Sequence, residues 1–494
     1  MDPSERARSL EAAADTSAAP RFVVVGHPNK GKSSIVATLA QDASVAIADE
    51  SGTTRTSTAY PMQVDGRVLY VLVDTPGFQR PSAALGELAA RTKSAGERPG
   101  AVRAFIAEHE LSGRFPDECE LLRPIMDEGG AGAGVLYVVD GSVPYGPEYE
   151  PEMEILRWSG RPRMALINLI GEREDHVVEW RTALGQYFSV VRVFDAVTAE
   201  FDRQLELLRA FGQLHDPWRA IMDEAVRALS RRRERQLNAA TRAIARMLAD
   251  AATHVETRRI AFDEAPDAAK AGLLDRYRDR LREIEHRGRD AVERAYGHPA
   301  LERDEPALAL IGADLFSAAT EQLFGLTRLQ AAQIGAAGGA GFGLLLDLAA
   351  QGLSLGMATV AGGAAGAAAA WFGFDRLARV EVLDMHALGA KEVRVGPLDN
   401  VSVRHAMIGR ALVHQAIVAA RTHAARDRLS ITLQGSAGQG ATGTLSVQDS
   451  RNLDKHFKAL ARAGRDERAL ADAEDGLREA LAPLMRREHT PRAG

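Results

Sequence analysis

The chain has 494 residues, with 67 acidic and 61 basic side chains, a net charge of −6 and a single cysteine. This length is too great for one hydrophobic core, so we expect two or three domains. The acidic balance argues against nucleic acid as a general partner, and one cysteine excludes an intrachain disulfide and suits a reducing cytosol.

Residues 1–20 are rich in alanine and mixed charges and contain no apolar stretch, which predicts a disordered leader rather than a signal peptide. From residue 21 to 212, short β-rich runs alternate with helical stretches. This alternation predicts an α/β domain with a parallel sheet and helices on both faces. The expected strands are Phe22–Val25, Val68–Val73, Val135–Val139, Ala165–Asn168 and Val190–Phe194.

A phosphate-binding motif follows the first expected strand. Residues Gly26–Ser33 read G-H-P-N-K-G-K-S and fit the pattern G-x-x-x-x-G-K-[ST]. A loop of this kind between a strand and a helix surrounds phosphates with backbone N–H groups. We expect Lys32 to reach the β/γ-phosphates and the Ser33 hydroxyl to bind Mg²⁺. The residues expected to line the nucleotide are Gly26, Asn29, Lys30, Gly31, Lys32, Ser33 and Ser34.

Two further motifs come in the order that a nucleoside triphosphatase requires. S-G-T-T-R at residues 51–55 offers Thr54 as a hydroxyl that binds Mg²⁺ only in the triphosphate state. D-T-P-G follows the second expected strand. There Asp74 can hold Mg²⁺ through water, and Gly77 can bring a backbone N–H to the γ-phosphate. The expected catalytic residues are therefore Lys32, Thr54 and Gly77, and the expected Mg²⁺ ligands are Ser33, Thr54 and Asp74.

A long connection, residues 78–134, separates the second and third expected strands. Ala101–Glu110 and Cys119–Asp127 within it have helical character. Insertions of this length usually carry function, so the connection is interpreted as a lid or a partner-docking surface. We interpret Cys119 as a packing residue rather than a nucleophile.

Residues 213–328 are predicted to form a helical stalk. Its spacing favours two long antiparallel helices that break near Asp263–Pro266. The run Arg231–Arg235 is interpreted as a solvated helix face, the alternative being contact with phosphates or lipid headgroups.

Residues 329–374 contain one charge, Asp347, and are very rich in glycine and alanine. Small residues recur four apart, as in closely packed membrane helices. Each arm of the expected hairpin is about long enough to cross a bilayer, and arginines at both outer ends favour cytoplasmic termini. The alternative is a soluble, tightly packed helix pair.

Residues 375–494 are predicted to form a small α+β domain. His405 and His414 are nine residues apart on a helix and therefore face opposite sides, which argues against a metal site. The expected strands are Lys391–Val395, Leu429–Gln434 and Thr444–Gln448, and the expected helices are Ala406–Ala425 and Leu453–Ala482.

The motifs G-H-P-N-K-G-K-S-S, G-T-T-R and D-T-P-G resemble those of the Era, EngA and TrmE branch of GTPases. The whole chain is similar to proteobacterial proteins that join such a G domain to a C-terminal domain of unknown function. The resemblance implies binding of GTP and GDP with Mg²⁺, GTP hydrolysis and a homodimer through the G domain.

The resemblance also bears on turnover and ion binding through three positions. Phe78 stands where many such GTPases have a water-orienting glutamine, which predicts slow turnover. Asn29 occupies the position that binds K⁺ in the TrmE-like branch, the alternative being a purely structural role in the loop turn. Gln79, next to Phe78, is a weaker candidate for the missing group.

The base-reading motif is incomplete. Asn168 is present, but Leu169, Ile170 and Gly171 follow it, so the carboxylate that accepts hydrogen bonds from guanine is missing. Asp195 and Ala196 fit the weaker motif whose backbone contacts the base. Guanine remains the preferred base by resemblance, with recruitment of Asp175 as one route to it.

The leading hypothesis is a switch-type GTPase in the cytoplasm, associated with the inner membrane through the bilayer or a membrane protein. One alternative is a soluble RNA- or ribosome-associated GTPase. Another is a nucleotide-locked interaction scaffold with little turnover.

Overall fold

The computed structural model describes residues 19–28, 30–40, 56–129, 132–170, 176–195, 201–297, 314–317, 320, 377–385, 389–420, 445–464 and 466–487. Several predictions lie outside these residues: Asn29, Thr54 and Ala196 in the site, the leader up to residue 18, the strand 429–434 and the Gly/Ala-rich hairpin 329–374. The chain divides into two compact units, residues 1–233 with 420–427, and residues 234–419 with 428–494. The finer division at residues 212, 328 and 374 stays a prediction.

The first unit is built on a six-stranded sheet of order β2-β3-β1-β4-β5-β6. Five strands are parallel and match the five predicted runs, while β2 pairs antiparallel with β3 at one edge and was not expected. The strands are β1 (Arg21–Val25), β2 (Thr58–Val64), β3 (Arg67–Asp74), β4 (Ala133–Asp140), β5 (Arg163–Asn168) and β6 (Val190–Val193).

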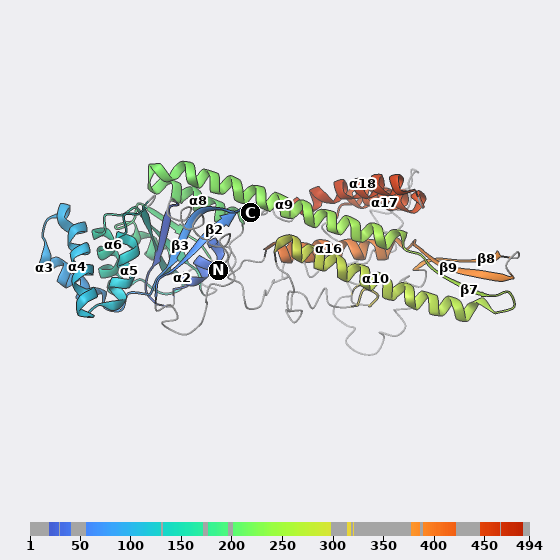
Figure 1. Ribbon diagram of the computed structural model, residues 1–494, viewed down its shortest axis with the longest axis horizontal. Coiled ribbons are helices and arrows are strands. Elements are labelled where there is room, and N and C mark those ends of the chain that lie inside the picture. The colour runs from blue at the N-terminus through green and yellow to red at the C-terminus, as the bar shows by residue number, and fades with distance from the viewer. Residues whose placement is uncertain are drawn as a thin grey trace, which may run out of the picture. The chain divides into compact units, whose positions relative to one another are not determined.

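Alternate residues of each central strand enter two different cores, because successive side chains point to opposite faces of a sheet. The helices are α2 (Lys32–Ala40), α3 (Pro81–Arg91), α4 (Arg98–Ser112), α5 (Pro116–Met126), α6 (Glu150–Trp158), α7 (Val177–Leu184), α8 (Phe201–Leu214) and α9 (Asp216–Thr253). Val23 and Val25 pack in one core under the helices that follow β3 and β4, whereas Phe22 and Val24 pack in the other under α2, α8 and the start of α9. The sheet is thus covered on both faces, as predicted (Figure 1).

Helices α3, α4 and α5 form the long connection between β3 and β4, and Figure 1 shows them gathered together. The two helices predicted there are present as α4 and α5, and α3 precedes them. His109 lies buried at their centre, in contact with the rings of Phe105 and Phe115, and its Nε2 lies 2.6 Å from Oε2 of Glu87. We call residues 81–126 the insertion.

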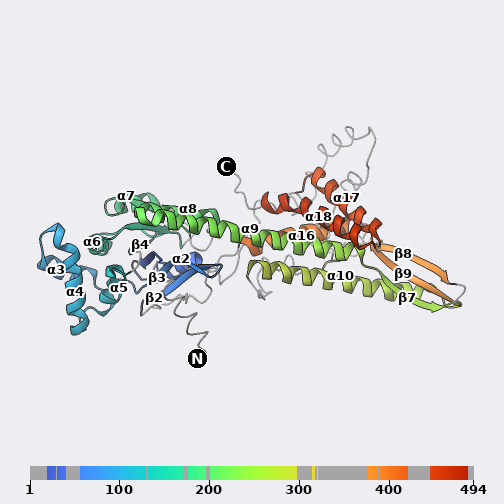
Figure 2. The same cartoon turned by 45° about the horizontal axis from the view of Figure 1, so that its top comes forward.

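The second unit contains the rest of α9, which runs antiparallel to α10 (Pro266–Tyr296) as predicted. Met247 of α9 lies beside Gly288 of α10, where a Cβ atom would come within 2.4 Å of the Met247 sulfur. Between the helices lies an unpredicted strand, β7 (Glu256–Ala261), which pairs with β9 (Ala390–Leu398). The sheet has the order β7-β9-β8, with β8 at Ala378–Met385, and is antiparallel throughout (Figure 2).

A buried ion pair joins α16 (Val401–Ala420) to α10 in the second unit, and a more exposed one lies on α10. Arg410 of α16 donates from Nε to Oε1 of Glu285 in α10 at 2.6 Å, and from a second nitrogen to the Thr320 hydroxyl at 2.9 Å. Asp314 accepts a 2.6 Å hydrogen bond from Nε of Arg282 in α10. Asp314 is therefore held on α10, and Thr320 on α16.

Two predictions for the C-terminal part are wrong. The strand predicted at Thr444–Gln448 is contradicted at residues 446–448, because Ser446 caps a helix by accepting the N–H of Asp449, and α17 (Val447–Ala463) begins there. The single helix predicted over Leu453–Ala482 is two, since Gly464 has a φ of +60° and separates α17 from α18 (Glu467–Arg487). The predicted strand Lys391–Val395 is confirmed within β9. Among the described residues, no helix combines the length and apolar character needed to span a bilayer.

Candidate functional site

The phosphate-binding motif forms the connection between β1 and α2, as predicted. Gly26 has a φ of +146° and Gly31 a φ of +77°, conformations that favour glycine. The close packing around both residues also requires glycine. A Cβ atom would lie 2.3 Å from the carbonyl oxygen of Val138 at Gly26, and 2.2 Å from Nδ2 of Asn168 at Gly31. Both glycines are therefore needed for the loop to lie this close to β4 and β5.

Lys32 opens α2 with its side chain folded back over the loop. Its Nζ donates to the carbonyl oxygens of Gly26 at 3.1 Å and His27 at 3.0 Å. Burial lowers the pKa of Lys32 to about 8, although the carboxylates of Asp74 and Glu152 act in the opposite direction. A bound anion beside this buried ammonium would raise its pKa again, because an opposite charge favours the protonated form.

The D-T-P-G segment lies directly beside the loop. The Ser33 hydroxyl donates to Oδ2 of Asp74 at 2.8 Å, and the Thr75 hydroxyl donates to the carbonyl oxygen of Val24 at 2.7 Å. A Cβ atom on Gly77 would lie 2.7 Å from the backbone nitrogen of Pro28, so glycine allows the two backbones to touch. The structure thus brings Lys32, Ser33, Asp74 and Gly77 together. Ser34 follows in the first turn of α2.

Asn168, at the end of β5, also reaches the phosphate loop. Its Nδ2 donates to the carbonyl oxygen of Lys30 at 3.3 Å, while the Lys30 ammonium lies 3.8 Å from Oδ2 of Asp140 at the end of β4. Ile170 follows with 52% of its surface exposed, an unusual degree for this side chain. Asp195 follows β6 and is half-buried. The carboxyl ends of the central strands therefore converge on one site.

Phe78 does not face this site. It is 1% exposed and packs in the core with Ala84 and Leu88 of α3. Gln79 next to it directs its side-chain amide at the carbonyl oxygen of Gly77, 3.5 Å away, and its backbone N–H at Glu118. Phe78 therefore serves as a core residue of the first unit.

Sequence reasoning missed a buried carboxylate behind the loop. Glu152 of α6 is fully buried, accepts the Tyr137 hydroxyl at 2.8 Å and lies 3.0 Å from Nδ1 of His27. The Glu152 carboxylate also raises the pKa of the Tyr137 hydroxyl, which burial has already raised well above its usual value. No spacing in the sequence links these three residues, because the sheet brings them together.

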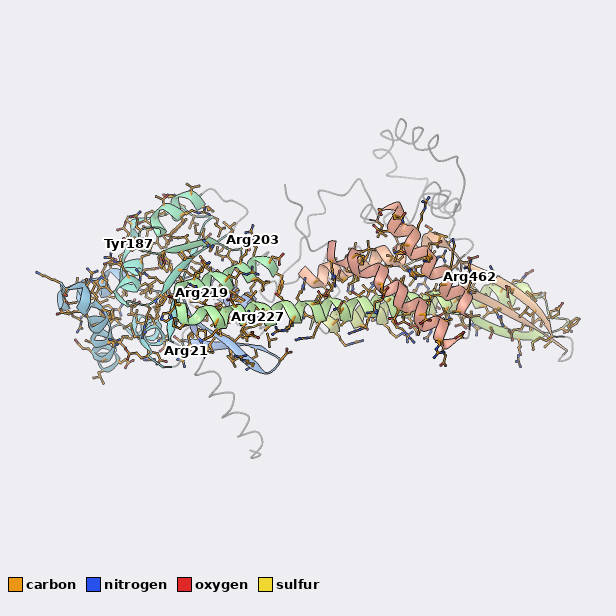
Figure 3. The ribbon with its side chains drawn as sticks, turned by 90° about the horizontal axis from the view of Figure 1, so that it is seen from above. Arg21, Tyr187, Arg203, Arg219, Arg227 and Arg462 are labelled. Carbon is orange, nitrogen blue, oxygen red and sulfur yellow. The ribbon has the colours of Figure 1, made fainter. Side chains whose placement is uncertain are left out.

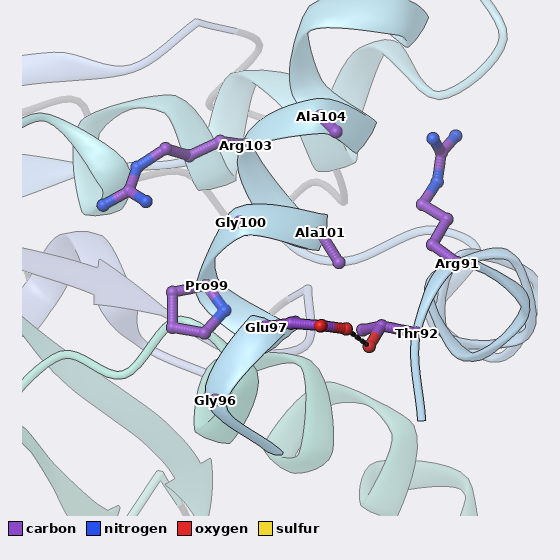
Figure 4. Close-up of a pocket in the computed structure, with 9 residues that line it drawn as sticks. All are labelled: Arg91, Thr92, Gly96, Glu97, Pro99, Gly100, Ala101, Arg103 and Ala104. Atoms are coloured by element: carbon purple, nitrogen blue, oxygen red, sulfur yellow. Dashed lines mark hydrogen bonds between the residues drawn. The ribbon is translucent and has the colours of Figure 1, made fainter. Parts of the chain in front are cut away.

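Two hollows elsewhere in the first unit are distinct from this site. One, of about 720 Å³, lies in the insertion between the end of α3 and the start of α4, where the Thr92 hydroxyl donates to Glu97 at 2.6 Å (Figure 4). Its two arginines are already paired, Arg91 with Glu108 and Arg103 with Glu128. The other, of about 640 Å³, follows the edge strand β6.

The residues present fit a nucleoside triphosphate with Mg²⁺. The glycine cradle requires the absence of Cβ atoms, the lysine is desolvated, and a serine hydroxyl and a carboxylate oxygen, both hard ligands suited to Mg²⁺, lie 2.8 Å apart. Asn29, Thr54 and Ala196 lie outside the described part of the chain.

Comparisons with known proteins agree with this architecture. Residues 21–168 match the family model described as 50S ribosome-binding GTPase, and residues 181–485 match a domain of unknown function, DUF3482. The chain is 46% identical to GTPase Der of Mycoplasma pneumoniae over 66 residues, which are 13% of this chain and 14% of that protein. It is 45% identical to GTPase Der of an Azoarcus species over 71 residues, 14% of this chain and 15% of that protein.

The matches to GTPase Der therefore span about one seventh of the length of those relatives. Among solved structures, a variant of Era from Aquifex aeolicus bound to GDP and AlF4⁻ is 17% identical, with 56% of this chain and 90% of that chain covered and a TM-score of 0.25. Era in complex with MgGDPNP and a segment of 16S ribosomal RNA is 15% identical, with 57% and 90% covered and a TM-score of 0.26. The match over residues 181–485 extends across more than half of the chain, which therefore belongs to the family of DUF3482 proteins and joins that domain to an N-terminal P-loop GTPase domain.

Proposed function

We propose that this protein binds GTP with Mg²⁺ and hydrolyses it slowly to GDP and phosphate, as a nucleotide-dependent switch. The observation that carries the proposal is the 2.8 Å hydrogen bond between Ser33 and Asp74 beside a buried Lys32 that points at the loop carbonyls. Two Mg²⁺-binding groups and one desolvated cation at the start of a helix suit a phosphate chain.

In this proposal each group has one task. Lys32 binds the β/γ-phosphates, Ser33 and Thr54 bind Mg²⁺ directly, Asp74 holds it through water, and the Gly77 N–H meets the γ-phosphate. The metal ion, when bound, neutralises charge on the phosphate oxygens. Gly26, Lys30, Gly31 and Ser34 complete the phosphate cradle, while Asn29 provides a K⁺ ligand.

Titration of the purified protein with fluorescent GDP tests the assignment of the phosphate site. The wild type should bind, and Lys32→Ala should bind at least about 100-fold more weakly because a buried ion contact to phosphate is lost. Normal binding by the Lys32→Ala protein would contradict the site. Turnover in KCl against NaCl tests the K⁺ proposal. Turnover that is indifferent to the cation, in wild type and Asn29→Ala alike, would contradict it.

Guanine specificity is a separate part of the proposal. Asn168, Asp195 and Ala196 are placed at the base by resemblance, and Ile170 offers an exposed apolar surface next to Gly31. Since the motif lacks its carboxylate, we expect discrimination between GTP and ATP to be weaker than in complete motifs. Competition of the two nucleotides against fluorescent GDP measures it. Equal affinity would rule out guanine specificity.

We further propose that the protein acts at the cytoplasmic face of the inner membrane, bound to lipid or to a membrane protein. The sequence of residues 329–374 motivates this, together with the resemblance to proteobacterial proteins of the same layout. Pelleting with liposomes tests it against a variant that lacks residues 329–374. Full-length protein that stays in the supernatant would contradict it. A homodimer through the G domain is tested by light scattering with and without GTP analogue.

A soluble RNA- or ribosome-associated GTPase is the second candidate, favoured by the description of the matching family model. The case for RNA binding is weakened because three arginines in the first half of α9 are already paired with carboxylates. Arg219 and Arg227 (Figure 3) lie on this helix and pair with Asp216 and Glu224 at 2.9 and 3.0 Å, and Arg231 pairs with Glu224 as well. The buried Phe78 favours the third candidate, a scaffold with little turnover. Multiple-turnover and ribosome-pelleting assays separate the three.

A further inference from the structure

We propose that Glu118 and Glu120 of α5 are positioning residues that tie the insertion to the two chain segments bordering the nucleotide. The proposal rests on the proposed function, because these segments are the ones expected to respond to the γ-phosphate. Neither glutamate belongs to a nucleotide-binding motif of the sequence, and neither lies in the phosphate loop.

Glu118 holds the segment after D-T-P-G. Its side chain is fully buried, and Oε1 accepts the backbone N–H of Gln79 at 3.1 Å and of Arg80 at 2.6 Å. The Arg80 side chain strengthens the link, since its guanidinium lies 4.7 Å from the ring centre of Phe115 and donates to the carbonyl oxygen of Arg114. Gln79 and Arg80 are thus attached to the start of α5 through both backbone and side chain.

Glu120 holds the segment after S-G-T-T-R. Its Oε1 accepts the Ser57 backbone N–H at 2.8 Å, and the Ser57 hydroxyl donates to the Glu120 carbonyl oxygen at 3.0 Å. Burial raises the pKa of Glu120, but the hydrogen bonds from Ser57 and the charge of Arg123 outweigh it, so that the pKa is lowered. Ser57 is two residues beyond the end of the S-G-T-T-R segment at position 55.

The spacing of the two glutamates explains why one helix can hold both segments. Residues i and i+2 of a helix point in different directions, so α5 offers one acceptor to each side. A shift of Gln79–Arg80 or of Ser57 on exchange of GDP for GTP must then either move α5 or break these hydrogen bonds. Helix α5 in turn packs on α4, to which Arg123 links it through a 2.7 Å bond to Glu110.

A second observation suggests that Glu118 serves more than stability. Its Oε2 is buried and has no hydrogen-bond partner in the part of the chain that the structure describes. A buried carboxylate oxygen without a partner is costly, and native proteins keep few of them. The acceptor at Oε1, which an amide oxygen would also provide, is therefore what this position requires, because it accepts both backbone N–H groups of the segment after D-T-P-G.

The test compares apolar and conservative replacements. Glu118→Met and Glu120→Met, singly and together, remove the acceptors, whereas Glu118→Gln and Glu120→Gln keep an amide oxygen in their place. Glu108→Gln is the matched control, because Glu108 pairs with Arg91 at 2.8 Å between α4 and α3 and contacts neither segment. Ser57→Ala is a milder change that removes one hydroxyl and keeps the backbone N–H, should a Met variant fail to fold.

For each protein, hydrogen–deuterium exchange in residues 116–126 is measured with GDP and with a non-hydrolysable GTP analogue. The GDP affinity, kcat and KM of the same proteins are also measured. In the wild type, Glu108→Gln and the Gln variants, we expect exchange to differ between the two nucleotides by at least about threefold. In the Met double variant the difference should vanish and kcat should fall about tenfold, with GDP affinity and KM within about twofold of wild type. Ser57→Ala should give a smaller loss of the exchange difference.

Three results would overturn the proposal. The first is a Met double variant in which exchange in residues 116–126 still differs between GDP and the GTP analogue. The second is an exchange difference that falls equally in the Met and Gln variants. The third is a wild type that hydrolyses GTP while exchange in α5 is the same with both nucleotides. The last result leaves the proposed function intact. A wild type that binds no nucleotide would instead remove the proposed function, and this inference with it.

Discussion

The hydroxyl of Ser33 donates a 2.8 Å hydrogen bond to Oδ2 of Asp74, joining the start of α2 to the end of β3. Both groups are hard oxygen ligands of the kind that Mg²⁺ prefers. In the proposed site, the hydrogen bond would hold the two side chains next to each other where the metal ion binds.

Replacing Ser33 with alanine should separate metal binding from folding. We expect Ser33→Ala to lose about 1 kcal/mol of unfolding free energy, as for one partly buried hydrogen bond. GDP affinity in EDTA should stay near wild type, while the gain in affinity on adding Mg²⁺ should fall at least about tenfold, since a direct ligand is missing. Fluorescent-GDP titrations with and without Mg²⁺ measure both. An unchanged response to Mg²⁺ would contradict the assignment.

Two glycines with nearly the same positive φ, one inside the phosphate loop and one outside it, offer a matched pair of substitutions. Gly31 has a φ of +77° and Gly66 a φ of +79°, but a Cβ atom would lie 2.2 Å from Asn168 at Gly31 and meets nothing within 4 Å at Gly66. Gly66→Ala should therefore cost only the backbone strain, about 1 kcal/mol, and leave nucleotide binding intact.

Gly31→Ala should add a collision to the same strain and abolish nucleotide binding. The double variant Gly31→Ala/Asn168→Ala should recover part of the lost stability, because the colliding atom is gone. Chemical denaturation and GDP titration of the four proteins check this. Equal effects of the two glycine substitutions would show that the contact with Asn168 is unimportant.

Phe78→Gln tests whether the missing glutamine can simply be restored. Phe78 is buried in the core of the sheet, so the substitution would bury an amide and leave a cavity, at a cost of about 3 kcal/mol. We expect a lower Tm and no increase in kcat for GTP, because side chains at this position point away from the phosphate loop. A faster enzyme of normal stability would show that residue 78 turns toward the nucleotide.

Cys119 should be almost inert toward thiol reagents in the folded protein. Burial raises the pKa of its thiol to about 11, with smaller contributions from Glu110 and Glu118. At pH 8 we expect iodoacetamide to react at least about 100-fold more slowly than in denaturant, because the thiolate is the reactive form. The folded state keeps this proton where the unfolded state loses it. Stability should therefore fall slightly as the pH rises from about 9 to 11. Mass spectrometry measures the rate at which iodoacetamide labels Cys119. Labelling of the folded protein at pH 8 as fast as in denaturant would contradict this prediction.

The strands around the nucleotide site were predictable because they are buried on both faces and read as continuous apolar runs, as in Val68–Val73. Strand β2 was not, because most of Thr58–Val64 is exposed and Pro61 interrupts it. In the C-terminal part, Thr444 and Val447 suggested a strand, but Ser446 with Asp449 three residues later is a helix-capping pattern. Local hydrogen bonding outweighed β propensity there.

In the site, too, some residues could be predicted from the sequence and others could not. The loop, Asp74 and Gly77 follow from motifs whose spacing is local. The partners Glu118, Glu120 and Glu152 do not, because helices from distant parts of the chain bring them to the loop and its neighbours. A glutamate in a helix is ordinarily solvated, and only tertiary packing distinguishes a buried one.

The anchoring of Thr320 by Arg410 has a consequence for chain connectivity. Asp314 is bonded to α10 and Thr320 to α16, and β8 pairs with β9 from Ala378 onward, so the described residues on either side of positions 321–376 belong to one folded unit. Because the entropy of closing a loop grows only with the logarithm of its length, this unit can accept stretches of very different length at that position with little change in its own stability.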